Sequence, residues 1–155
     1  MREILEELGD KSPAFFSTDM SGILTVESKI DCFKVEKKIK EKIIDEPWSI
    51  RYIRRIIPIQ KTSISNLDDI SKESIRLASI MRDDETFRIT IEKRNSDLSS
   101  KEIITKIAKE IPNVVSLEQP TWIILIQILG NQTGISVLRK NDVLSVENEK
   151  RKLSE

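Results

Sequence analysis

The stretch TWIILIQILG, residues 121–130, decides the fold class. Its apolar side chains occupy consecutive positions, so both faces of an extended segment would be apolar. This pattern is typical of a central strand that is covered on both sides. A turn at Gly130-Asn131 and the stretch GISVLR, residues 134–139, come next and predict a neighbouring strand. We therefore expect an α/β (α+β) fold organised around this strand.

Two segments before this strand have clear and different periods. ETFRITIEKR, residues 85–94, has apolar side chains at every second position, which predicts a strand with one buried face. DLSSKEIITKIAKEIP, residues 97–112, has apolar side chains three and four positions apart, which predicts a helix. Ser99 and Glu102 have the spacing of a capping box, so we expect the helix to begin there.

The patterns on either side of these segments are shorter. Residues 63–84 have apolar side chains at helical spacing, which predicts one helix or two short ones. Ser65 and Asp68 have the spacing of a cap at its start. NVVSLEQP, residues 113–120, predicts a short strand.

The N-terminal part of the chain reads as strand, helix and strand. Residues 14–29 contain two short runs of strand-forming side chains, and residues 31–47 have the apolar stripe of an amphipathic helix. WSIRYIRRIIPIQK, residues 48–61, is rich in isoleucine and predicts another strand. We expect residues 22–60 to form one compact βαβ-like unit, with both strands in one sheet.

The composition excludes several classes of site. The chain has no histidine and only one cysteine, Cys32, which excludes a zinc site, a catalytic triad, a Cys/His dyad and an intrachain disulfide. Its four glycines are scattered, so no phosphate-binding glycine loop is present. We expect no metal and no cofactor. No apolar run approaches the ~18 residues of a membrane span, and the N-terminus lacks a signal core, so we expect a cytoplasmic protein.

The formal net charge is zero, but the charges are unevenly distributed. Residues 29–61 carry 10 basic and 5 acidic side chains, and residues 86–109 carry 6 and 3. Residues 62–85, between them, carry 3 basic and 6 acidic side chains. Two basic blocks can form one basic face in the folded chain, and the local field governs the attraction of a polyanion. Each block taken alone is more simply a solvated face.

Three arginines interrupt the isoleucine-rich segment: Arg51, Arg54 and Arg55. A strand destined only for a core would not carry them, because a buried unpaired charge is very costly. The planar guanidinium suits phosphate, although an ion pair of Arg51 or Arg54 with Asp68 or Glu92 is an equal alternative. In a regular strand Arg51 and Arg55 point to one side and Arg54 to the other, so all three could not serve one ligand unless the strand is bulged.

Aromatic side chains offer a second way to bind nucleic acid. Trp48, Tyr52 and Trp122 could stack on bases. Aromatic residues are more often part of a core or an interface, and we take that as the expectation for these three. It is strongest for Trp122, which opens the most apolar strand.

Several motifs, taken in chain order, resemble the THUMP domain, and the resemblance covers about residues 48–138. The motifs are RYIRRIIPI (51–59), TFRITIEKR (86–94), VSLEQPTWIILIQI (115–128) and GISV (134–137). Thr121 replaces a usual aspartate, and Asn95 replaces a usual glycine, although asparagine tolerates the left-handed conformation. The resemblance implies a mostly parallel sheet flanked by helices, in three parts: a small ferredoxin-like α/β subdomain at 1–60, a THUMP core at 61–140 and a charged tail at 141–155.

The resemblance also implies a function, because the THUMP domain is an RNA-binding module of tRNA-modification proteins. Larger relatives append a catalytic domain, for which we expect no room here. The chain is similar to the stand-alone THUMP adaptor that helps an acetyltransferase make N4-acetylcytidine in tRNA. A non-catalytic adaptor is therefore implied, with tRNA bound at its acceptor stem or 3′ end and a separate modification enzyme as partner. Alternatives are a protein-interaction module without RNA binding, or the RNA-binding subunit of a split methyltransferase or thiouridine synthase. The residues predicted to contact RNA are Arg54, Arg55, Lys93, Arg94, Arg51, Lys61 and Lys38.

Overall fold

The computed structural model describes residues 1–154 and divides the chain into two compact units. The first unit comprises residues 1–58 together with the C-terminal residues from Asn141 onward, and the second comprises residues 59–140. Both contain helices and strands, so the expected α+β class is confirmed. Among the described residues, no helix is both long and apolar enough to cross a membrane.

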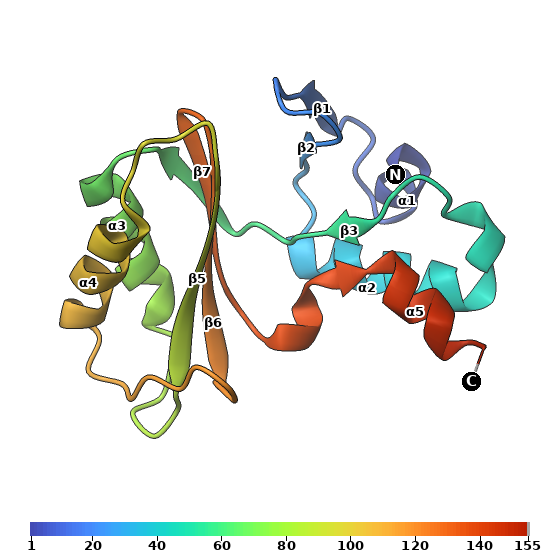
Figure 1. The fold of residues 1–155 in the computed structure, drawn as a ribbon. Helices are drawn as coiled ribbons and strands as arrows, with labels where there is room; N and C mark the ends of the chain where they lie inside the picture. The colour runs from blue at the N-terminus through green and yellow to red at the C-terminus, as the bar shows by residue number, and fades with distance from the viewer. Residues whose placement is uncertain (155) are drawn as a thin grey trace. The chain divides into compact units, whose positions relative to one another are not determined.

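The second unit is built on one four-stranded sheet with the strand order β4-β7-β6-β5 (Figure 1). Its strands are β4 (Lys61–Ile64), β5 (Phe87–Arg94), β6 (Trp122–Leu129) and β7 (Gln132–Leu138). Only β5 and β6 are parallel, whereas β6–β7 and β4–β7 are antiparallel. The expectation of a mostly parallel sheet is therefore wrong. The two-residue turn between β6 and β7 allows only an antiparallel pair, because a parallel pair needs a long crossover.

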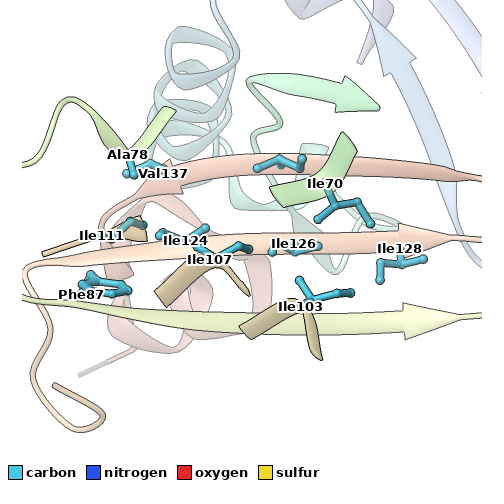
Figure 2. Packing of buried hydrophobic residues seen from close by; sticks show 11 residues of the cluster. Ile70, Ala78, Phe87, Ile103, Ile107, Ile111, Ile124, Ile126, Ile128 and Val137 are labelled. Carbon is cyan, nitrogen blue, oxygen red and sulfur yellow. The ribbon is translucent and has the colours of Figure 1, made fainter. Parts of the chain in front are cut away.

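Two helices, α3 (Leu67–Ala78) and α4 (Ser100–Glu110), lie on the same face of this sheet (Figure 1). Figure 2 shows isoleucines of both helices pointing at the isoleucines of β6, with Phe87 of β5 beside them. The residues of this core are Ile70, Ala78, Phe87, Ile103, Ile107, Ile111, Ile124, Ile126, Ile128, Ile135 and Val137. The alternation predicted for β5 is confirmed, because Ile89 and Ile91 pack against the same cluster.

Strand β6 is a central strand that is buried on both faces, as its sequence predicts. Ile124 and Ile126 face the helices, and Ile123 and Leu125 on the opposite face are also buried. The Ile59 side chain packs against Gly134 of the neighbouring β7. A Cβ added to Gly134 would lie 3.0 Å from carbons of Ile59. The β7 glycine therefore makes room for an isoleucine that covers this face.

The predicted N-cap is correct for α4, whereas the observed N-cap of α3 lies one residue after the predicted one. The Ser99 hydroxyl accepts a hydrogen bond from the Glu102 backbone N–H at 3.3 Å, which confirms the start of α4. The cap of α3 is Asn66, whose side-chain oxygen accepts from the Asp69 N–H at 2.7 Å, and not Ser65. Residues 113–120, expected as a strand, contribute a single bridge from Val115 to β5.

The first unit packs its helices around a smaller core. Its elements are α1 (Arg2–Glu7), β1 (Ala14–Ser17), β2 (Leu24–Glu27), α2 (Cys32–Asp45), the 3-10 helix η1 (Pro47–Ser49), β3 (Arg55–Ile56), β8 (Leu144–Ser145) and α5 (Val146–Lys152). A second 3-10 helix, η2 (Lys140–Asp142), precedes β8. The apolar stripe of α2 is confirmed, since Ile39 and Ile43 are fully buried. The rest of this core consists of Ile4, Ile50, Leu144 and Val146.

The C-terminal segment belongs to this unit and is not the separate charged tail that we predicted. β8 pairs with β3, and the Lys40 ammonium of α2 lies 3.9 Å from the Glu149 carboxylate of α5. Leu144 and Val146 are only 1% and 4% exposed. Burying each of these two side chains stabilises the fold by roughly 1.5–3 kcal/mol. This gain holds the segment in the core although most residues around them are charged.

Two further expectations for the first unit are wrong. β1 and β2 form a hairpin that pairs with neither β3 nor β8, so the strands on either side of α2 do not share a sheet. The predicted strand over residues 48–61 is mostly irregular chain, with β3 as its only strand before Pro58. The charges of Arg51, Arg54 and Arg55 are costly to bury without a partner, which disfavours a long strand inside a sheet.

Candidate nucleic-acid interface

Residues 47–58 run across the surface of the first unit with their backbone held at several points. The side chain of Ile50 is buried, and its carbonyl accepts a hydrogen bond from the Lys150 ammonium. The Arg54 carbonyl accepts from the Val146 N–H at 2.9 Å. The C-terminal segment therefore fixes the path of the chain that carries the arginines.

All three arginine side chains of this segment are exposed. Arg51 Nε donates a hydrogen bond to the Trp48 carbonyl at 3.0 Å, which closes a local turn after η1. The strand alternation that would have separated the three does not apply, because Arg51 and Arg54 lie outside any strand. Asp68, one of the carboxylates considered as a partner, contacts Lys106.

The two aromatic side chains of this segment do not lie in the core, contrary to our expectation. Tyr52 is 94% exposed and Trp48 is 65% exposed. Trp122 does follow the expectation: its ring packs against the core of the second unit, and the Arg139 guanidinium lies 4.3 Å from its centroid. The position of Trp48 and Tyr52 among arginines, which are mostly exposed, is the sequence feature that could have indicated the exposure of the two rings.

Lys38, on α2 of the first unit, is half-buried, and its ammonium lies 3.9 Å from the Glu7 carboxylate. An ion pair at a protein surface contributes only ~0–1 kcal/mol, so this charge is not tightly committed to its partner.

Cys32 at the start of the same helix is a poor nucleophile. Burial raises the pKa of its thiol to about 11, so the thiol is protonated at neutral pH.

Lys93 and Arg94 end strand β5 in the second unit, and both are exposed. The Lys93 ammonium donates to the Leu98 carbonyl at 2.7 Å, and the Arg94 carbonyl accepts from the Gly130 N–H at 2.9 Å. Asn95 follows with a φ of 53°, so the left-handed conformation expected of it is confirmed. The structure thus presents this basic pair at a well-ordered turn.

Lys61 begins β4, on the opposite edge of the sheet from Lys93 and Arg94. Two strands lie between the edges, which places Lys61 roughly 14 Å across the sheet from β5 at ~4.8 Å per strand. Lys61 is aligned with Ile91 through the pairings of Ile135 and Ile126. Lys61 and the Lys93-Arg94 pair are therefore separate contacts and not one cluster.

The second unit has a groove over α4, and the charges that line it are mixed. It is lined by Leu67, Ser99, Lys101, Glu102, Thr105, Lys106, Lys109 and Glu110. Its lysines alternate with carboxylates, so it has no strong positive field. Among residues 1–154, no group of three or more acidic or cysteine side chains is placed to hold a metal ion.

Two solved structures are similar to parts of this chain. PH1313 from Pyrococcus horikoshii Ot3 is 18% identical, covers 93% of this chain and aligns with a TM-score of 0.64. This chain spans only 45% of the length of PH1313, and at this identity the likeness concerns the fold alone. TrmN from Thermus thermophilus is 14% identical, covers 60% of this chain and 31% of its own, with a TM-score of 0.42.

A comparison with curated proteins finds no significant match. A comparison with protein families does find one, and it begins after the arginine-rich segment. That segment, which we had included in the resemblance, lies outside the matched residues. Residues 65–138, a little under half of the chain, match the family model of the THUMP domain, and the chain therefore contains a THUMP domain.

Proposed function

We propose that this protein is a non-catalytic tRNA-binding adaptor that presents tRNA to a separate modification enzyme. The observation that carries the proposal is the exposure of Arg51, Arg54 and Arg55 on a backbone anchored by Ile50 and Val146. Guanidinium groups on a fixed backbone bind phosphate with little ordering cost. The THUMP domain in the same chain supports RNA as the source of that phosphate.

The contacts we propose are with the phosphates of the acceptor stem or 3′ end of tRNA. Arg54 and Arg55 act from the first unit, and Lys93 and Arg94 act from the turn after β5. Arg51, Lys61 and Lys38 add to the positive field. Contacts of this kind read the shape of RNA more than its sequence.

The enzyme that uses the bound tRNA is, in this proposal, a separate acetyltransferase that forms N4-acetylcytidine. A role in presentation is supported by the lack of histidine and by the protonated state of Cys32 at neutral pH. Deletion of the gene, followed by mapping of tRNA modifications, tests the choice of enzyme. Loss of N4-acetylcytidine is expected. Loss of a methylated or thiolated nucleotide would favour the split-enzyme alternatives.

The test of RNA binding is the double substitution Arg54→Ala with Arg55→Ala, measured by filter binding to bulk tRNA over a range of salt. Removing one side chain that binds a phosphate reduces the slope of log affinity against log salt by about 1, so we expect the slope to fall by about 2. Lys101→Ala with Lys109→Ala removes the same charge from the mixed-charge groove and serves as the control. Unchanged affinity and slope in a variant that is still folded by circular dichroism would refute the proposal.

One observation favours the alternative of a protein-interaction module. Val114, Val115 and Leu117 form an exposed apolar run in the loop before β6, and Leu117 is 72% exposed. Exposed apolar side chains that lie together are typical of protein contacts. A protein that binds no tRNA, whose deletion removes no modification, would support this alternative.

A further inference from the structure

The chain has seven aromatic residues, and the two most exposed lie four positions apart in the arginine segment. Tyr52 is 94% exposed and Trp48 is 65% exposed. An aromatic ring contributes to folding chiefly through the apolar area that it removes from water. The fold therefore gains almost nothing from Tyr52 and little from Trp48, so both rings are available to a ligand.

The backbone between the two rings is held in place. Pro47–Ser49 form η1, and Arg51 Nε donates to the Trp48 carbonyl at the end of that turn. Ile50 is buried between them, and its carbonyl accepts from Lys150. Anchoring of this kind lowers the ordering cost of binding, because the rings are presented by a chain that is already fixed.

The charge around the rings is of one sign within the segment. No acidic residue occurs between Glu46 and Asp68, whereas Arg51, Arg54 and Arg55 are all exposed. Rings interleaved with guanidinium groups are the arrangement that binds single-stranded nucleic acid, with bases stacked on the rings and phosphates held by the cations. An apolar protein partner would instead leave three guanidinium charges to be desolvated.

We propose that Trp48 and Tyr52 stack on unpaired bases and make this segment selective for single-stranded over double-stranded RNA. The inference rests on the proposed function and deepens it by naming the state of the nucleotides that bind. In an A-form duplex the bases are stacked on one another, so the rings find no base face. The arginines alone bind the phosphates of either form. The rings therefore distinguish unpaired from paired RNA, and the cations do not.

The experiment compares two probes with the full chain: a labelled oligouridine, which is unpaired, and a blunt RNA duplex of the same length. Trp48→Ala and Tyr52→Ala should each weaken oligouridine binding by about 5- to 100-fold, as expected for loss of one stacked base. Neither should change duplex binding. Trp48→Phe and Tyr52→Phe keep a ring and should retain most of the affinity. Leu117→Ala, which removes an apolar side chain that is 72% exposed in the second unit, is the control.

The outcomes separate this inference from the proposed function. If the wild-type chain binds both probes with the same salt dependence and the alanine variants bind as the wild type does, the stacking inference is wrong and RNA binding stands. Equal losses on both probes would also overturn it, because they would indicate a general effect on the segment. If the wild-type chain binds bulk tRNA but neither probe, the inference fails and the proposed function stands. If it does not bind bulk tRNA either, the proposed function fails and the inference fails with it.

Discussion

The substitution Leu144→Ala tests whether the C-terminal segment is a structural part of the first unit. The Leu144 side chain is 1% exposed and belongs to the core that contains Ile39, Ile43 and Ile50. The change removes the carbons beyond Cβ, each contributing ~0.8 kcal/mol of transfer free energy and together ~2.4 kcal/mol. A cavity term adds to this, so we expect the free energy of unfolding to fall by ~3 kcal/mol, within the usual range of ~2–5 kcal/mol.

The assay is urea denaturation followed by far-ultraviolet circular dichroism, with Leu153→Ala as the matched control. Leu153 is in the same segment but is 45% exposed, so its truncation should change the free energy of unfolding by less than about 0.5 kcal/mol. If Leu144→Ala were as mild as Leu153→Ala, the segment would not be packed in the core. The prediction of a separate charged tail would then be correct after all.

Two further predictions concern packing and pH. Gly134→Ala should destabilise the second unit by ~1–3 kcal/mol, because the new Cβ meets Ile59 at 3.0 Å. In a double-mutant cycle, Ile59→Ala in the same chain should remove most of that added cost. Additive effects of the two substitutions would contradict the contact. The pKa of Asp10 is lowered by hydrogen bonds from the Ser28 hydroxyl and from the backbone N–H groups of Ser12 and Lys29. The stabilising effect of the Asp10 carboxylate is therefore present above the unfolded-state pKa of about 3.9 and is lost as the pH falls through the lower folded-state pKa. Asp10→Asn should therefore flatten the loss of stability below about pH 4, and a pH series of denaturation curves with an unchanged acid limb would rule this out.

The two helices of the second unit and its strands β5, β6 and β7 were predictable because each has a local sequence signal, whereas β4 (Lys61–Ile64) was not predicted. β5 alternates, β6 is apolar at every position except Gln127, and the Ser99 cap marks where α4 begins. These patterns depend on neighbours in the sequence, which is all that periodicity can use. The order of the strands in the sheet was not predictable in the same way. A sheet order of β4-β7-β6-β5 depends on which segments meet in space.

The first unit was predicted less well because its decisive contacts are distant in sequence. Arg55 pairs with Ser145, and the partner of Ile56 is Leu144. The isoleucines around Arg54 indicated a strand because isoleucine is common in strands. β propensity reflects packing on a sheet, however, and only Arg55 and Ile56 pair with another strand. Of the described residues in the charged tail, only Leu144 and Val146 are buried, and two buried positions are too few to produce a periodic signal.

The exposure of the arginine side chains was predicted, and the exposure of the two aromatic rings was not. Arginine is almost always exposed, so residue type alone indicated that Arg54 and Arg55 reach solvent. Tryptophan and tyrosine are usually well buried, and residue type alone therefore indicated the opposite of what Trp48 and Tyr52 do. The exposure of a ring depends on whether another element covers it, and that is a property of the tertiary structure.

The site and the core of the first unit are connected through the backbone of residues 50–54. Val146 donates to the Arg54 carbonyl and Lys150 to the Ile50 carbonyl, so a segment about a hundred positions away in the sequence holds the proposed RNA-binding chain. A guanidinium on a mobile chain would have to be ordered on binding, at ~0.5–1.5 kcal/mol per side chain and more for the backbone. Under the proposed function, the C-terminal segment strengthens RNA binding without touching RNA, and loosening it should weaken binding to paired and unpaired RNA alike. Loss of a ring should weaken binding only to the unpaired form, and this difference distinguishes a residue that positions the site from one that contacts a base.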